Sequence, residues 1–276
     1  MTSSCAMGWR ALGWMWLAAM QLSCASTETS LRFDKPIVLL GETHDNAHHH
    51  DIQRQALQSI LDGGARPALL MEQFDRERQG DIDLALASGA DAAGLIAAGS
   101  GLAPGAAQSS SQWQWRFYEP LIALALRYRL PVVAANVSRA DARKIIADGL
   151  AAHGFDARVP LEIETLQAED IERSHCGLVD AAMARRMAAA QIARDQFMAR
   201  ALQQHAARGA VLIAGNGHTR RDIGVPRWLS TAERAFTEAI GLLEEGGPNP
   251  EGMFDRIVMT PPQPRTDPCA GMRRSG

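Results

Sequence analysis

Two short motifs of the same form, each placed directly after an apolar run, constrain this chain most strongly. Residues 36–40 lead into a Gly-x-x-His motif that ends at His44, and residues 210–214 lead into one that ends at His218. A short apolar run bounded by glycine is typical of a buried strand. Open α/β sheets bind ligands at the carboxyl ends of their strands. The pattern therefore predicts two histidines at one sheet edge, facing a shared cleft.

The order of the remaining elements indicates the fold class. Apolar runs at residues 37–40, 68–71, 130–135 and 211–214 alternate with helical stretches, and residues 235–243 and 254–259 are further candidate strands. Such alternation is typical of a mostly parallel sheet flanked by helices on both faces. We expect a single α/β domain over residues 33–260 and a disordered, proline-containing tail over residues 261–276.

The first residues have the pattern of an export signal. Arg10 precedes an apolar run over residues 11–20, which is too short to span a bilayer as a helix, and Ser23-Cys24 follows. A cysteine after a small residue at this place is typical of a bacterial lipoprotein. We expect residues 1–25 to be a signal peptide, with Cys24 acylated and the protein anchored to the membrane facing the periplasm. The alternative is ordinary cleavage nearby, which gives a periplasmic protein.

Charge and cysteine content exclude other classes. The net charge is −3 and no basic run occurs, so the sequence offers nothing for nucleic acid. Two of the four cysteines lie in the export segment, which leaves Cys176 and Cys269. Two cysteines are too few for a disulfide framework. Since Cys269 lies in the tail, we expect no structural disulfide.

Polar side chains end each of four predicted strands, namely Glu42 with His44, Glu72, Asn136, and Asn216 with His218. Turns are polar, so a single polar strand end needs no functional explanation. Four together favour a site, because histidine and carboxylate groups at one edge suit a metal ion or an acid–base pair. The residues predict either a divalent-metal site or a hydrogen-bonded cluster that ties the strand ends together.

Two helices carry polar residues on their apolar faces. His49 falls in the apolar stripe of the first helix, so we expect it to point inward. A lone inward histidine is usually a hydrogen-bonded core residue, but the nearby His44 makes His49 a candidate metal ligand. Gln191, Arg194 and Asp195 interrupt the stripe of the long helix over residues 179–207. A buried charged pair must be paired and hydrogen-bonded. We interpret these residues as a brace that supports the site, with direct ligand contact as the alternative.

The chain contains only two tyrosines, Tyr118 and Tyr128, both in the predicted helix over residues 117–129. A buried tyrosine normally packs with its hydroxyl bonded, but a phenolate can also bind ferric haem. His175-Cys176-Gly177 precedes the long helix, and its spacing fits no zinc motif. From the residues alone it is an ordinary turn.

Taken in order, these segments resemble the ChaN-like haem-binding lipoproteins of the wider Tiki, TraB and erythromycin-esterase superfamily. The resemblance extends over about residues 36–245. It is carried by Gly41-Glu42-Thr43-His44-Asp45-Asn46, Met71-Glu72-Gln73-Phe74, Trp115-x-x-Tyr118-x-Pro120, Ala134-Ala135-Asn136-x-x-Arg139, His175-Cys176-Gly177, Gln191-x-x-Arg194-Asp195 and Gly215-Asn216-Gly217-His218.

The resemblance implies haem as the ligand, a role in haem or iron uptake, and outer-membrane uptake components as partners. It also implies a homodimer with haem at the interface, where a tyrosine of one subunit ligates iron and a histidine and a lysine of the other hold the propionates. Tyr118 lies in the family motif and is the expected ligand, with Tyr128 as the alternative; His175 is the propionate candidate. Neither Lys35 nor Lys144 lies in a matched motif, so either an arginine substitutes for the lysine or the haem contact is altered.

A metal-dependent hydrolase or peptidase is the second hypothesis, and a non-catalytic envelope scaffold is the third. The related peptidases imply that His44, His218, Glu42 and Glu72 surround a divalent metal, with the two glutamates catalytic. Under either leading hypothesis the supporting residues are Asn136, Arg139, Gln191, Arg194, Asp195 and Asn216. Whether the protein is an enzyme stays open at this point.

Overall fold

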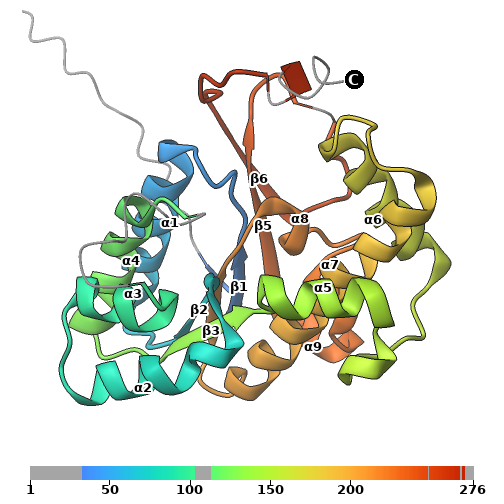
Figure 1. Ribbon diagram of the computed structural model, residues 1–276. Helices are drawn as coiled ribbons and strands as arrows, with labels where there is room; N and C mark the ends of the chain where they lie inside the picture. Colours follow the sequence, from blue (N-terminus) through green and yellow to red (C-terminus); the bar gives the residue numbers. More distant parts are fainter. Residues whose placement is uncertain (1–32, 103–112, 248, 268, 271–276) are drawn as a thin grey trace, which may run out of the picture.

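A single parallel sheet organises the computed structural model, which describes residues 33–102, 113–247, 249–267 and 269–270 (Figure 1). Its six strands follow the order β3-β2-β4-β1-β5-β6, and every neighbouring pair is parallel. The strands are β1 (Ile37–Leu40), β2 (Ala68–Asp75), β3 (Val132–Asn136), β4 (Ala210–Ile213), β5 (Thr237–Glu244) and β6 (Arg256–Thr260). The predicted α/β fold is confirmed, whereas the predictions for residues 1–25 lie outside the described residues.

Helices cover both faces of the sheet because its central strands are apolar on both. In β1, Val38 and Leu40 pack into one core cluster, while Ile37 and Leu39 pack into another on the opposite face. Figure 1 shows α1–α4 on one side of the sheet and α5–α7 on the other. The helices are α1 (Ala47–Asp62), α2 (Gln79–Ala87), α3 (Ala92–Ser100), α4 (Trp115–Arg127), α5 (Arg139–Asp148), α6 (Leu161–Ser174), α7 (Ala181–His205), α8 (Asn216–Thr219) and α9 (Thr231–Ala235).

Local signals set several helix boundaries. Asn46 caps α1, because its side-chain oxygen accepts a 2.9 Å hydrogen bond from the backbone nitrogen of His48. Helices α2 and α3 are separated by a turn at Gly89, where φ is +73°, a conformation that favours glycine. Helix α6 was not predicted. Across the described ranges, no helix combines the length and apolarity needed to cross a bilayer.

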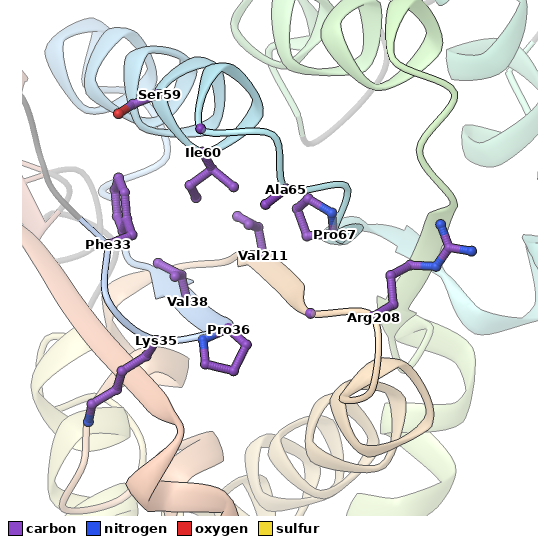
Figure 2. A pocket seen from close by; sticks show the side chains of 12 residues that line it. Phe33, Lys35, Pro36, Val38, Ser59, Ile60, Ala65, Pro67, Arg208 and Val211 are labelled. Atoms are coloured by element: carbon purple, nitrogen blue, oxygen red, sulfur yellow. The ribbon is translucent and has the colours of Figure 1, made fainter.

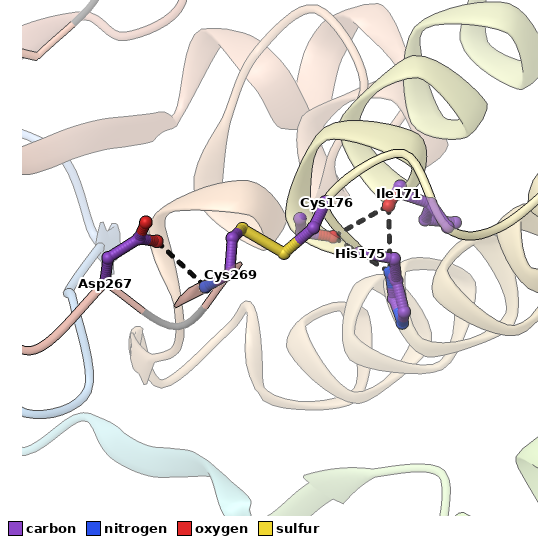
Figure 3. Close-up of a disulfide and its surroundings, with 6 residues drawn as sticks. Ile171, His175, Cys176, Asp267 and Cys269 are labelled. Atoms are coloured by element: carbon purple, nitrogen blue, oxygen red, sulfur yellow. Dashed lines mark hydrogen bonds between the residues drawn. A yellow bond between two sulfur atoms is a disulfide. The ribbon is translucent and has the colours of Figure 1, made fainter. Parts of the chain in front are cut away.

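The pairing of the two remaining cysteines differs from its prediction. Cys176 and Cys269 form a disulfide with a Cα–Cα distance of 5.6 Å, so the expectation of unpaired cysteines is wrong (Figure 3). The described part of the tail is also held in place: Arg265 forms ion pairs with Asp45 and Glu244. The sequence could not show these pairings, because each partner is distant in the chain and only the fold brings the two together.

Candidate functional site

Three strand ends bring four predicted site residues together at the carboxyl edge of the sheet. Glu42 and His44 follow β1, Glu72 lies within β2, and His218 lies in α8, just after β4. Because β4 lies between β1 and β2 in the sheet, the three strand ends are neighbours. The parallel arrangement thus produces the grouping that the Gly-x-x-His motifs indicate.

Glu42 is the centre of a buried hydrogen-bond network and is only 2% exposed. Its Oε1 accepts a 2.5 Å bond from the Tyr118 hydroxyl and lies 2.7 Å from Nδ1 of His44. Its Oε2 accepts a 2.8 Å bond from Nε2 of Gln53. Burial raises the pKa of this carboxyl. The hydrogen bond from His44 and the charge of His50 lower the pKa by more than burial raises it, so the net shift is downward. Glu42 is therefore a fixed anion at neutral pH.

His44 stands at the open side of this network, with 44% of its side chain exposed. Since Nδ1 of His44 is bonded to Glu42, the other ring nitrogen, Nε2, faces Gly215. A Cβ placed on Gly215 would lie 3.1 Å from this Nε2 and 3.7 Å from Oε2 of Glu72, so both groups border one small space above the glycine. Burial lowers the pKa of His44, whereas the bond to Glu42 and the charge of Glu72 raise it to a net value above the ordinary one. His44 is thus an oriented imidazole at the surface.

A second chain of hydrogen bonds runs from Glu72 to Asp195. Nδ1 of His218 lies 2.6 Å from Oδ1 of Asp195, and its Nε2 lies 3.5 Å from Oε1 of Glu72. The other oxygen of Glu72 accepts a 2.7 Å bond from the backbone nitrogen of Gly215. Gln167 completes the chain by donating to Oδ2 of Asp195 at 3.2 Å.

The two carboxylates determine the charge of His218. Burial lowers the pKa of this imidazole, but the charges of Glu72 and Asp195 raise it to about 10 overall. Burial raises the pKa of Asp195 to about 6, and the charge of His218 shifts the pKa of Glu72 well below its usual range despite its burial. At neutral pH the chain is therefore carboxylate–imidazolium–carboxylate.

The contacts do not support the predicted metal centre of His44, His218, Glu42, Glu72 and His49. In the part of the chain that the structure describes, no group of three His, Cys, Asp or Glu residues is placed to hold a metal ion. Both ring nitrogens of His49 are occupied, Nδ1 by the backbone nitrogen of Thr43 and Nε2 by Oγ1 of Thr260, each at 2.8 Å. Burial lowers the pKa of His49 to about 4, so this histidine is a neutral structural residue.

The polar residues of α7 serve two purposes rather than one. Arg194 donates to Oδ1 of Asn136 at 3.1 Å and to Oε1 of Gln191 at 3.3 Å, so these three residues brace the end of β3 against α7. Asp195 instead bonds His218 directly. The predicted brace therefore divides into a supporting part and one residue that belongs to the cluster itself.

Asn216 has a structural role beside the cluster. Its side-chain amide donates to the carbonyl of Leu242 at 2.6 Å, and its Oδ1 accepts from the backbone nitrogen of Leu242 at 3.2 Å. This pair of bonds joins α8 to β5. Arg139 lines a cavity of about 230 Å³ at the same sheet edge, together with Asn136 and the tryptophans Trp113 and Trp115.

The two tyrosines occupy opposite ends of α4. Tyr118, near the start of the helix, is 0% exposed, and burial together with the charge of Glu42 raises the pKa of its hydroxyl far above the usual range. Tyr128, at the C-cap, is half-buried. Its hydroxyl accepts a 3.2 Å bond from Gln58, and the guanidinium groups of Arg66 and Arg127 lie 5.0 and 5.5 Å from its ring centroid. Tyr118 is therefore enclosed by the fold, whereas part of the Tyr128 side chain is exposed.

His175 lies at the C-cap of α6 (Figure 3), whereas the two tyrosines belong to α4. Its Nδ1 is 2.8 Å from the carbonyl oxygen of Ile171, and Cys176 beside it forms the disulfide.

A further cavity of about 230 Å³ opens where the β1 and β4 strands begin (Figure 2). Apolar side chains such as Phe33 and Ile60 line it, and Lys35 donates away from it to the carbonyl of Thr237 at 2.9 Å.

Four residues with defined contacts in the cluster received no role from the sequence, and one of them is Gln73 of β2, whose Nε2 donates to Oε1 of Glu42 at 3.4 Å. Gln53 and His50 contact Glu42 from α1, and Gln167 contacts Asp195 from α6. Gln53 lies on the inward-facing apolar stripe of its helix. A polar residue at such a core position was the sequence signal that could have indicated its role in the cluster. Gln167 had no comparable signal, because its helix was not predicted.

Comparison with known proteins identifies the class. Residues 33–229 match the family model described as haem-binding uptake, Tiki superfamily, ChaN. The match covers well over half of the chain, and the chain therefore belongs to this family. No curated protein sequence matches it.

One solved structure supports this fold, and two others are more distantly similar. The structure that describes cofacial haem binding to ChaN of Campylobacter jejuni is 19% identical, with a TM-score of 0.66, and the alignment covers 81% of this chain and 86% of that chain. An erythromycin esterase, EreC, is 14% identical with a TM-score of 0.43, covering 77% and 71%. The type III effector HopBA1 is 12% identical with a TM-score of 0.44, covering 83% and 88%. The last two are too distant to inform function.

Proposed function

We propose that this protein is an exported haem-binding protein that serves haem or iron uptake. The observation that carries the proposal is the family match over residues 33–229. The disulfide between Cys176 and Cys269 supports a location in the cell envelope, because disulfides persist in oxidising compartments. Acylation of Cys24, attachment to the membrane facing the periplasm and transfer of haem to or from outer-membrane components belong to the same proposal.

The contacts favour Tyr128, not Tyr118, as the iron ligand. For Tyr118 to ligate iron, its hydroxyl would have to leave Glu42 and lose a proton whose pKa is raised by burial. The hydroxyl of Tyr128 accepts a single hydrogen bond near the surface, and a phenolate ligand suits ferric haem. Arg66 and Arg127 lie beside the Tyr128 ring and would be the groups to pair with propionates, since guanidinium groups bind carboxylates well. They would replace the lysine that the family pattern implies.

A homodimer completes this proposal. A haem held by one tyrosine at the surface has one face exposed to water, and a second copy of the chain would cover that face. Burial of the apolar porphyrin between two subunits contributes favourably at roughly 25 cal/mol per Å². His175 remains a candidate propionate contact from the second copy, since it is partly exposed.

Haem titration of three matched proteins tests the ligand. Tyr128→Phe removes the ligating oxygen with almost no change in volume, so it should lose the wild-type Soret band and weaken affinity by at least about tenfold, equivalent to about 1.4 kcal/mol. Tyr118→Phe is the control, and it should keep the spectrum and the affinity. If Tyr118→Phe loses both while Tyr128→Phe keeps them, the ligand assignment is wrong.

A second candidate function is hydrolysis without a metal. One observation favours it: His44 and His218 are each oriented through Nδ1 by a buried carboxylate, at 2.7 and 2.6 Å. An imidazole held in this way can act as a general base or acid through Nε2. His44, which is half-exposed, would accept a proton from water, while Glu72 and His218 would stabilise charge beside it. Cleavage of a chromogenic ester that survives chelation with EDTA and is lost in His44→Ala would support this candidate; its absence in the wild type would exclude it for that ester.

A further inference from the structure

The C-terminal strap, defined as the described residues 261–267 and 269–270, is fastened to the body of the protein at two distant places. The first is Arg265, whose guanidinium donates to both oxygens of Asp45 at 2.5 and 2.6 Å and to both oxygens of Glu244 at 2.6 and 2.7 Å. Asp45 directly follows His44 in the loop between β1 and α1. This fastening therefore lies beside the open side of the cluster.

The same loop is tied to the strap a second time. The side-chain amide of Asn46, which is 0% exposed, donates to Oε1 of Glu244 at 2.6 Å and to the carbonyl oxygen of Pro261 at 3.1 Å. Asn46 also caps α1. The position of the strap is thus coupled to the position of the loop that carries His44.

The second fastening is the disulfide at the far end of the strap (Figure 3). It joins Cys269 to Cys176, which lies between α6 and α7, and the two cysteines are 93 residues apart in the chain. Figure 1 shows α1 and α6 on opposite sides of the sheet, with the C-terminal segment passing above it between them. The strap therefore connects the β1–α1 loop on one side of the sheet with the α6–α7 loop on the other, across the carboxyl edge.

The disulfide is accessible and lies outside the core. Both cysteines are partly exposed, and neither belongs to the buried apolar clusters that hold the sheet and helices together. A soluble thiol can therefore reach the bridge, and its cleavage removes no contact within those clusters. What cleavage removes is the attachment of the strap to the α6–α7 loop.

We propose that the strap is a thiol-controlled device that sets the mobility of the His44 loop. A dithiol reductant transfers two electrons to the Cys176–Cys269 bridge; with two protons the sulfurs become two thiols, and the reductant becomes a disulfide. The strap is then held only by the Arg265 ion pairs and the Asn46 bonds. These bonds hold the strap at its Arg265 end only, and nothing covalent then joins its other end to the α6–α7 loop. The loop between β1 and α1 gains motion, and access to His44 and Glu72 increases.

Hydrogen exchange followed by mass spectrometry tests this on the full chain. Treatment with dithiothreitol should speed amide exchange at least about tenfold in residues 261–267 and in the loop that carries His44, while β2 and β4 stay unchanged. The reagent diethyl pyrocarbonate should also modify His44 faster after reduction. The control is Cys269→Ser, which should exchange like the reduced wild type and should not respond to dithiothreitol.

Two outcomes would overturn the proposal. If reduction leaves exchange in both segments unchanged, the strap does not depend on the bridge. If reduction speeds exchange throughout β2 and β4 as well, the disulfide stabilises the whole fold and is no local device. Arg265→Gln in the oxidised protein separates the two fastenings, because it should loosen the His44 loop while Cys269 stays bridged.

Discussion

Replacement of Tyr118 by phenylalanine isolates one bond in the centre of the cluster. The ring would keep its place, since its edge-on contacts with His50 at 4.9 Å and with Trp115 at 6.1 Å do not involve the hydroxyl. What is lost is the 2.5 Å hydrogen bond to Oε1 of Glu42, a carboxylate that is buried and charged. Hydrogen bonds to charged groups contribute about 1.5–3 kcal/mol. We expect the free energy of unfolding to fall by about 2 kcal/mol at pH 7.

Urea denaturation at several pH values provides the assay. The pKa of Glu42 is lowered in the folded protein, so its stabilisation is present above the ordinary value of 4.5 and is lost as the pH falls through the lower folded value. The Tyr118 hydroxyl contributes to that lowering, so the difference between wild type and Tyr118→Phe should shrink at low pH. The Tm should fall by about 4–8 °C at pH 7.

The matched control for this experiment is Tyr128→Phe. Its hydroxyl bonds a neutral amide near the surface, so we expect a loss of about 0.5–1 kcal/mol. The reasoning is refuted if Tyr118→Phe loses less than about 0.5 kcal/mol at pH 7, or if its loss is as large at pH 3 as at pH 7.

Two further substitutions test the rest of the cluster. Asp195→Asn removes a carboxylate that raises the pKa of His218, so NMR titration should show a pKa well below about 10, and the protein should lose about 3–5 kcal/mol of stability at pH 7. In the wild type, the stabilisation from His218 is complete below its ordinary value of 6.5 and is lost as the pH rises through about 10. Gly215→Ala places a Cβ 3.0 Å from the ring of His44, so the ring should shift; an unchanged His44 chemical shift would contradict the geometry.

The sheet and the location of the cluster were predictable because both follow from local patterns. Apolar runs that end in glycine define β1 and β4, and a parallel sheet brings their ends to one edge. Polar residues on buried helical faces identified His49 and Asp195 as inward-facing. The role of each residue could not be predicted from its position on the helix, because that role depends on its hydrogen-bond partners. His49 bonds Thr43 and Thr260, whereas Asp195 bonds His218.

The missed disulfide and the contacts of Tyr118 both depend on partners that are distant in sequence. Helical periodicity places Tyr118 on the buried face of α4, but only the fold shows that its hydroxyl meets Glu42. The Cys176–Cys269 disulfide requires the tail to cross the sheet edge, and no spacing rule predicts a pairing over 93 residues. The family resemblance predicted Tyr118 as the iron ligand from its position in the motif. We propose Tyr128 instead, because Tyr118 is fully buried and Tyr128 is partly exposed.

Native mass spectrometry of the purified protein with added ferric haem tests the central claim most directly. The account predicts a haem-loaded species that survives gentle desolvation, with dimers enriched when haem is present, and loss of that species in Tyr128→Phe. A wild-type protein that stays monomeric and haem-free at micromolar concentrations of both components would contradict the account.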